Sequence, residues 1–173
     1  MSKILPVLVI CVVLALAGGT AVAQTNPVAA SDAQKVFDQM KALEGSWHGT
    51  IMNIPIDVTI RLASSNTAIL YEATTGGGRP PNHEITMFYV DGDRFLATHY
   101  CDGGNRARFD GKLSPDGKTS EFNFLDVAGN TRGGLVNRMA FTILDPNKHL
   151  VEFTFIRPDG KPMELRGEFE RTK

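Results

Sequence analysis

The stretch MFYVDGDRFLATHYC, residues 87–101, holds two runs of aromatic and aliphatic residues joined by the pair Asp91-Gly92. An Asp-Gly pair favours a two-residue hairpin turn, because both central positions of that turn need a positive φ. The stretch therefore predicts a β-hairpin formed by strands 82–90 and 93–101. Turn residues recur every eight to twelve positions over the rest of the chain, which indicates that one hairpin follows another.

Ten strands are predicted by a period of two in hydrophobicity and by the turn residues between the runs. A meander of ten short strands hides its edges best in a closed up-and-down barrel or in a face-to-face sandwich. We expect an all-β fold, an antiparallel up-and-down barrel with about ten strands. The predicted strands are Ser46–Met52, Ile56–Ala63, Thr67–Thr74, Asn82–Val90, Asp93–Cys101, Asn105–Leu113, Thr119–Val127, Leu135–Leu144, His149–Arg157 and Pro162–Arg171.

One helix is predicted before the first strand. Ser31 can accept a free backbone N–H while Gln34 reaches back to the helix start, as in a capping box. The apolar residues that follow have helical spacing, so they form one stripe that must pack against another element. We expect this helix to cover one end of the barrel.

The N-terminus predicts export. Lys3 precedes the apolar run 4–17, and Ala21-Val22-Ala23 has the small-x-small pattern of a signal peptidase site. We expect residues 1–23 to be a signal peptide, 24–30 a flexible leader and 31–173 the β-barrel domain, which is periplasmic or secreted. An uncleaved anchor is the alternative, although the run is short for a membrane span; cleavage would leave no stable span.

Charge and cysteine content exclude several classes of protein. The chain has 173 residues with 18 Lys and Arg against 19 Asp and Glu; without Lys3 the exported part keeps 17 against 19, so no nucleic-acid partner is expected. Cys101 is the only cysteine after the signal segment, because Cys11 lies within it. An internal disulfide is therefore impossible, and the thiol is either buried and inert or a nucleophile.

Two motifs resemble known barrel families. Gly45-Ser46-Trp47 after a short helix resembles the opening of the calycin barrels, which include lipocalins, fatty-acid-binding proteins and nitrobindin-like haem barrels. The resemblance implies that Trp47, the only tryptophan, closes the base of the barrel. The hairpin 87–101, followed by Asn105 and Arg106, is similar to one in uncharacterised exported bacterial lipocalin-like proteins. Nitrobindin-like barrels hold haem through a histidine near the C-terminal strand, but residues 162–173 contain none, so no cofactor is expected.

The predicted barrel interior is typical of a ligand pocket, because it combines aromatic and aliphatic side chains with a few polar ones. We expect it to bind a small, hydrophobic or amphipathic molecule without catalysis. Two alternatives stay open: a lyase-type or isomerase-type enzyme that uses His99 with Tyr71 or Cys101, and an envelope structural protein whose barrel is filled by its own side chains. The predicted ligand-binding residues are Trp47, Tyr71, His99, Asn137, Phe141, Phe153, Arg106 and Arg108.

His99 and Cys101 share one face of their strand and are the candidate catalytic residues. Their Cα atoms should lie roughly 6.5–7 Å apart, which is long for proton transfer, so we favour His99 as an interior polar group bonded to Tyr71 or Asn137. The histidine and cysteine spacings match no metal motif, and no metal is expected.

Other polar residues have two interpretations. Arg106 and Arg108 share a face of their strand, and they form either an anion clamp inside the barrel or a solvated stripe outside it. The hydrophobic pattern slightly favours the outside. His48 and His149 are expected to be exposed, and His83 to lie at the rim. The glycine-rich stretches 76–81 and 128–134 are predicted to be flexible connections, either gates or merely tolerated length.

Overall fold

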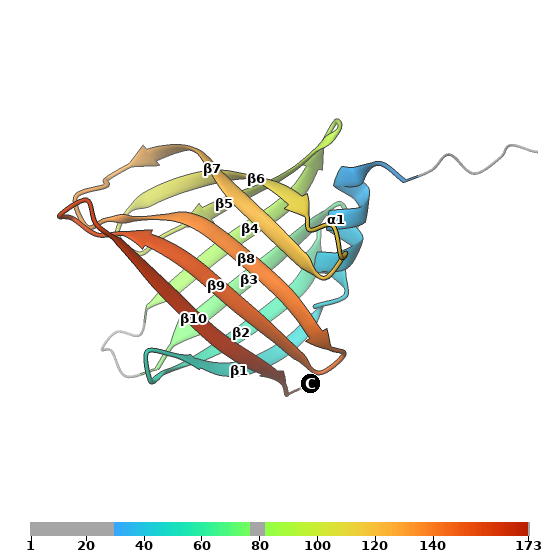
Figure 1. The fold of residues 1–173 in the computed structure, drawn as a ribbon, viewed down its shortest axis with the longest axis horizontal. Helices are drawn as coiled ribbons and strands as arrows, with labels where there is room; N and C mark the ends of the chain where they lie inside the picture. The colour runs from blue at the N-terminus through green and yellow to red at the C-terminus, as the bar shows by residue number, and fades with distance from the viewer. Residues whose placement is uncertain (1–29, 77–81, 173) are drawn as a thin grey trace, which may run out of the picture.

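The computed structural model describes residues 30–76 and 82–172. In this part of the chain, ten strands close into one antiparallel barrel, in which each strand pairs with its neighbours in sequence and β10 pairs with β1 (Figure 1). The predicted up-and-down barrel is confirmed, and the sandwich alternative is wrong. The strands are β1 (Gly45–Ile51), β2 (Ile54–Ala63), β3 (Ala68–Thr75), β4 (His83–Asp91), β5 (Arg94–Tyr100), β6 (Asn105–Leu113), β7 (Thr119–Gly129), β8 (Leu135–Asp145), β9 (Lys148–Ile156) and β10 (Pro162–Arg171).

The strand boundaries agree with the predicted ones to within two residues at every end, because the turn residues fix them. Gly92, Gly117 and Gly160 each follow an aspartate and have φ of 62°, 71° and 78°. These values lie in the left-handed region that glycine enters without a steric penalty. The turns therefore enforce hairpins between neighbouring strands.

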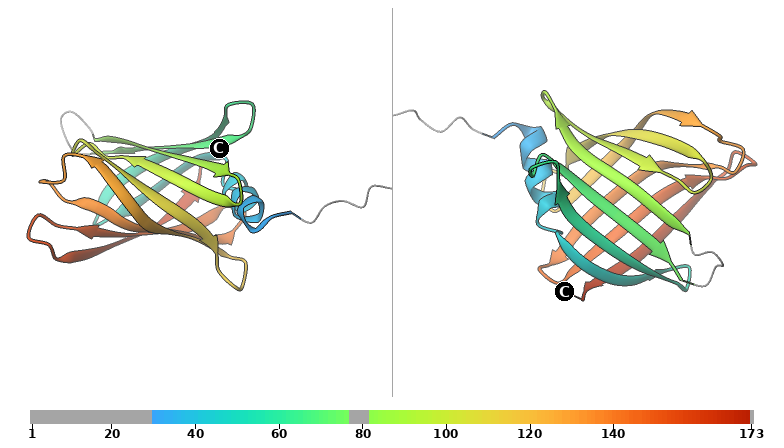
Figure 2. Two further views of the ribbon diagram at one scale, coloured as in Figure 1. Left: turned by 90° about the horizontal axis from the view of Figure 1, so that it is seen from above. Right: turned by 180° about the vertical axis from the view of Figure 1, so that it is seen from behind.

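The helix α1 (Asp32–Lys41) lies across one end of the barrel (Figures 1 and 2). The Ser31 hydroxyl accepts a hydrogen bond from the backbone N–H of Gln34 at 3.1 Å, as predicted. The Gln34 side chain does not reach back; its amide donates instead to Asp38, one turn later, at 2.9 Å. Phe37 packs edge-to-face on Phe95 of β5 with centroids 6.0 Å apart, so the apolar stripe of α1 closes this end.

Trp47 anchors the same end, in agreement with the predicted closing role. Its side chain is buried, and its indole N–H donates to the carbonyl of Leu43, after α1, at 2.8 Å. The guanidinium of Arg171, on β10, lies 4.1 Å from the centre of the indole ring. That guanidinium also donates to the carbonyls of Glu44 and Pro146. One arginine therefore links the end of the helix, the last strand and the β8–β9 turn.

The prediction that His149 is exposed is wrong. Its side chain is fully buried between Trp47, at 4.3 Å between ring centres, and Phe169, which stacks at 5.4 Å. Both ring nitrogens lack a hydrogen-bond partner among the described residues. Period-two counting places His149 on the same face as Val151, but its position at a strand start outweighed that signal. Burial, together with the positive charge of Arg171, lowers the pKa of His149 to about 4.

We expect this histidine to make stability depend on pH. An unfolded histidine has a pKa of about 6.5. Between pH 6.5 and about 4, the unfolded state therefore binds a proton at this residue that the folded state does not bind. The contribution of His149 to the free energy of unfolding should be fully present above pH 6.5 and fall by about 3 kcal/mol as the pH drops through that window. Urea unfolding at a series of pH values measures this change.

The His149→Phe variant isolates the contribution of this residue, because phenylalanine fills the aromatic stack without titrating. The difference between wild type and variant should grow as the pH falls from 6.5 to 4. His48→Gln is the matched control, since His48 is exposed beside Asp57. Parallel pH curves for wild type and His149→Phe would contradict the prediction.

The predicted signal peptide and leader lie outside the described residues, except for Ala30, and so does the 77–81 part of the first glycine-rich stretch. No helix in the ranges 30–76 and 82–172 is both long and apolar enough to cross a membrane. The export prediction therefore stays a prediction.

Candidate functional site

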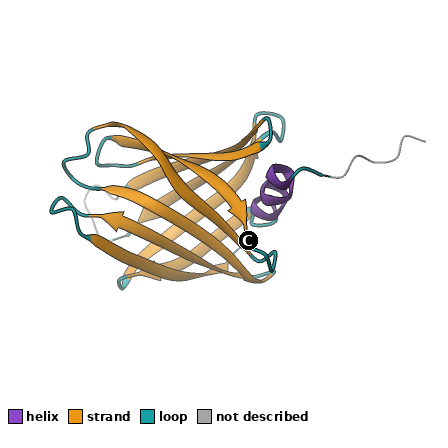
Figure 3. Ribbon diagram, turned by 45° about the horizontal axis from the view of Figure 1, so that its top comes forward, coloured by secondary structure: helices purple, strands orange, loops and turns teal. Residues whose placement is uncertain are grey.

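A cavity of about 300 Å³ lies inside the end of the barrel away from α1. Figure 3 shows the helix at the other end, while this end is bordered by loops and strand ends. The wall is mostly apolar, and its polar residues gather on β3, β4 and β5. The lining residues are Ile51, Met52, Ile54, Ile56, Tyr71, Ala73, Thr75, Glu84, Thr86, His99, Cys101, Val136, Phe153, Phe155, Met163 and Leu165.

The β1–β2 turn forms one edge of this cavity. Met52 and Asn53 both have positive φ, 53° and 63°, which makes the two-residue turn tight. The Met52 side chain is 65% exposed and Ile54 is 47% exposed, although both line the cavity. Two apolar side chains therefore stand at the mouth, where a ligand could meet them.

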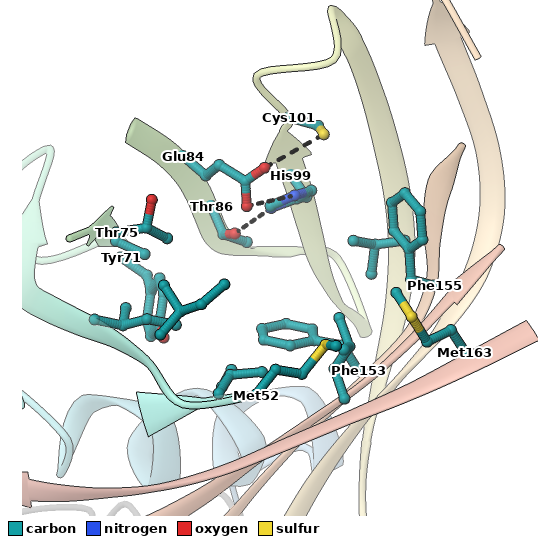
Figure 4. Close-up of a pocket in the computed structure, with 16 residues that line it drawn as sticks. Met52, Tyr71, Thr75, Glu84, Thr86, His99, Cys101, Phe153, Phe155 and Met163 are labelled. Carbon is teal, nitrogen blue, oxygen red and sulfur yellow. Dashed lines mark hydrogen bonds and ion pairs between the residues drawn. The ribbon is translucent and has the colours of Figure 1, made fainter. Parts of the chain in front are cut away.

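The polar wall is a four-residue cluster of Glu84, Thr86, His99 and Cys101 (Figure 4). The antiparallel register pairs Thr86 with His99, and continuing the same register places Glu84 opposite Cys101. Thr86 Oγ1 lies 2.9 Å from His99 Nδ1, and Glu84 Oε2 lies 3.7 Å from His99 Nε2. The Cys101 thiol donates to Glu84 Oε1 at 3.3 Å. The carboxylate therefore lies between the imidazole and the thiol.

The turn after β5 holds the sulfur in place. The backbone N–H of Gly103 donates to Cys101 Sγ at 3.4 Å, and the N–H of Gly104 donates to the Cys101 carbonyl at 2.9 Å. The Asp102 carboxylate accepts from the backbone N–H of His83 at 2.9 Å, which links this turn to the start of β4. These contacts fix Glu84 and Cys101 relative to each other.

Burial controls the protonation of the cluster. It lowers the pKa of His99, although the negative charges of Glu84 and Asp102 oppose the shift. It raises the pKa of the Cys101 thiol to about 11, where the Gly103 N–H acts in the opposite direction. It also raises the pKa of the Tyr71 hydroxyl, with a further contribution from the charge of Glu84. Near neutral pH the site therefore holds a thiol, a phenol and a neutral imidazole.

Four of the predicted site residues line the cavity: Tyr71, His99, Cys101 and Phe153. The partner predicted for His99 is wrong, because Thr86 and Glu84 face its ring in place of Tyr71 or Asn137. Cys101 is half-buried at the cavity wall, between the buried and the exposed positions that the sequence left open. The direct His99–Cys101 pair is replaced by an arrangement in which Glu84 lies between the two.

The other predicted site residues lie elsewhere. Trp47 belongs to the closed end, and Phe141 lies deeper in the core, edge-to-face with Tyr71 at 5.6 Å. Asn137 is displaced by a β-bulge, since the β8–β9 register passes directly from Val136 to Arg138. Period-two counting does not detect such an extra residue, because the bulge shifts the alternation of side chains by one position. The bulge makes Val136, and not Asn137, line the cavity.

Arg106 and Arg108 are both exposed on the outside of β6, so the anion clamp is wrong and the solvated stripe is confirmed. Arg108 forms an ion pair with Asp126 on the neighbouring β7. His83 is 52% exposed at the start of β4, beside Glu72. The connection 128–134 is held by the buried Asn105 amide, which donates to the carbonyls of Asn130 and Gly134 at 3.3 and 3.1 Å.

Sequence reasoning missed Glu84 and Thr86. The signal was present, because both share a strand face with Phe88, which is fully buried. A glutamate two positions from a threonine and four from a core phenylalanine therefore points into the barrel. The same counting on β10 places Met163 and Leu165 at the cavity, and both residues line it.

The fold and cavity define a class of protein: a closed ten-stranded antiparallel barrel with a helix at one end and a small pocket at the other. No protein-family model matches the sequence, and no curated protein matches it. The crystal structure of Rv2717c from M. tuberculosis is similar to this barrel, with a TM-score of 0.63 at 14% identity, over 80% of this chain and 98% of that chain. A protein with unknown function from the DUF3598 family of Nostoc punctiforme matches over 79% of this chain and 98% of that chain, with 7% identity and a TM-score of 0.22. The likeness to Rv2717c shows the fold alone.

Proposed function

We propose that the protein is an exported, calycin-like barrel that binds a small, mostly apolar molecule in its cavity without transforming it. The observation that carries the proposal is the cavity itself, with about 300 Å³ of space and a largely apolar wall. That volume is at the lower end of the range for ligand pockets. A molecule of modest size would bury its apolar body against Phe153, Phe155 and Leu165.

The polar wall supports an amphipathic ligand over a purely apolar one. Glu84, Thr86 and His99 present oxygen and nitrogen atoms to one side of the cavity, and His99 Nε2 has no hydrogen-bond partner among the described residues. A ligand with one polar group would satisfy such atoms and gain orientation from them.

The alternatives have less support. A nucleophilic Cys101 needs a thiolate, whereas burial raises the pKa of that thiol to about 11. A barrel filled entirely by its own side chains would leave little free volume, which disagrees with the cavity at the open end. Of the exposed large apolar side chains, Met52 and Ile54 belong to the cavity mouth, where a ligand would cover them. Tyr100, Leu125 and Leu144 come from separate strands, and single apolar residues of this kind are usual on soluble proteins.

Native mass spectrometry of the protein purified gently from its own compartment tests the proposal. We expect an additional mass, in a one-to-one ratio, that disappears when the protein is denatured. The mass of the denatured chain also reports whether residues 1–23 have been removed. Ala73→Phe should abolish the additional mass, because Ala73 lines the cavity and the new ring would occupy it.

Ala128→Phe is the matched control, since Ala128 is an exposed residue of β7 on the outside of the barrel. This variant should retain the bound molecule. If the native protein carries no bound molecule, binding is measured instead by titration with a fluorescent apolar probe. The proposal would be overturned if the wild-type protein carried no bound molecule and also bound no probe. Equal binding by wild type and a folded Ala73→Phe variant would overturn it as well.

A further inference from the structure

We propose that Glu84, His99 and Cys101 form a binding site for one divalent transition-metal ion of the zinc type. One carboxylate oxygen, one imidazole nitrogen and one sulfur from these residues all lie within 4.8 Å of one another. Carboxylate, imidazole and thiolate are the three side-chain ligands that zinc takes in proteins. The site goes beyond ligand binding in the cavity and does not depend on it.

The strongest observation is the state of His99. Its side chain is 4% exposed, and Nε2 has no hydrogen-bond partner in the described part of the chain although it faces Glu84 Oε2 at 3.7 Å. A buried polar nitrogen without a partner is rare in proteins and calls for an explanation. Thr86 occupies Nδ1 at 2.9 Å, so the ring is oriented with Nε2 toward the cluster. Metal-binding histidines are usually oriented in this way, by a hydrogen bond from the ring nitrogen that does not bind the metal.

The distances approach those around a tetrahedral ion, and the three ligand atoms would draw together from within 4.8 Å of one another when the ion binds. Ligand atoms bound to zinc at the usual bond lengths lie about 3.3–3.6 Å from each other. The Glu84 carboxylate lies 3.3 Å from Cys101 Sγ and 3.7 Å from His99 Nε2, through its two oxygens. A small rotation of the carboxylate would turn one oxygen to the ion. Little rearrangement of the backbone is required, because all three residues already occupy one wall.

Charge also favours a divalent cation. On binding, the zinc–sulfur bond forms as the Cys101 thiol releases its proton to the solvent, so a thiolate, a carboxylate and a neutral imidazole surround the ion. The two negative charges neutralise the two positive ones. The Gly103 N–H, which already donates to Sγ at 3.4 Å, would stabilise the thiolate.

Three protein ligands leave one tetrahedral position. Because all three residues line the cavity (Figure 4), that position would open toward it. A water molecule or the polar group of a cavity ligand would fill it. Spacing along the sequence predicts no metal here, because the ligands come from two paired strands and a turn. The register between β4 and β5 brings them together.

The experiment is a zinc titration of the purified protein in its natively processed form, after a chelator has removed bound metal. Competition with a colorimetric zinc indicator measures the affinity. We expect one equivalent of zinc to bind. Each of the substitutions that removes a ligand should weaken binding by more than roughly 10–100-fold, which is the usual effect of losing a residue that only orients a ligand. These substitutions are Glu84→Gln, His99→Gln and Cys101→Ser. Thr86→Val keeps all three ligands and should weaken binding by about tenfold.

The surface pair Glu72 and His83 is the matched control, because it has the same chemistry on the outside, with His83 Nε2 3.8 Å from Glu72 Oε1. Glu72→Gln and His83→Gln should leave zinc affinity unchanged. Replacement of zinc by Co²⁺ tests the sulfur ligand without any substitution, since a cobalt–thiolate charge-transfer band appears only if Cys101 is bound. Failure to bind one equivalent, a cobalt spectrum without that band, or unchanged affinity in folded Cys101→Ser would overturn the proposal.

Discussion

Trp47→Ala is expected to lower the free energy of unfolding by about 4 kcal/mol, the range found when a buried tryptophan is truncated. The indole is 1% exposed and contacts His149 and Arg171, so its removal leaves a cavity at the closed end. It also deprives the Leu43 carbonyl of its donor, which lies 2.8 Å away. Chemical denaturation followed by circular dichroism measures the loss.

Trp47→Phe separates the two contributions. Phenylalanine fills most of the space but cannot donate to Leu43, so we expect a loss of about 1–2 kcal/mol, the usual result of leaving a buried acceptor unpaired. Neither variant touches the cavity residues, which line the other end of the barrel. The folded fraction should therefore keep whatever ligand and zinc affinity the proposed cavity sites have. A loss below about 1 kcal/mol in Trp47→Ala would contradict the anchoring role.

Gly49→Val is expected to destabilise the barrel by about 3 kcal/mol, because the new side chain overpacks the seam between β1 and β10. A Cβ atom at Gly49 would overlap the carbonyl oxygen of Glu168 and lie 2.8 Å from the Phe169 ring. A Cβ atom at Gly167, on the facing strand, would also come too close to the Thr50 carbonyl oxygen. Small residues on both strands therefore permit the close approach that closes the barrel.

The seam is also where hydrogen exchange should report the damage. In Gly49→Val the amide of Thr172 should exchange faster, since it donates to the Ser46 carbonyl at 2.7 Å across the seam. Gly133→Val is the matched control, because no atom lies within 4 Å of a Cβ added at Gly133. It should change stability by less than about 0.5 kcal/mol. Equal effects of the two substitutions would show that the seam is not tightly packed.

Much of the cavity wall was accessible to sequence reasoning. Period-two counting from Phe95 places His99 inside the barrel, and counting from Phe155 places Phe153 there, because side chains alternate strictly along a regular strand. The same rule, applied to β4 from Phe88, would have found Glu84. Counting failed at Asn137, where a bulge adds one residue. Position at a strand start misled the prediction for His149, which the alternation from Val151 places inside the barrel.

The sequence by itself determined the strands, the turns and the helix, because these depend on neighbours close in the chain: Asp-Gly turns, alternation of apolar residues and the Ser31 cap. Only the tertiary structure decided which side chains meet. Register pairs Thr86 with His99 and sets Glu84 beside Cys101, and barrel closure brings Arg171 onto Trp47 across more than 120 residues of sequence. Such contacts depend on how strands align and how the sheet closes, and no local pattern records either.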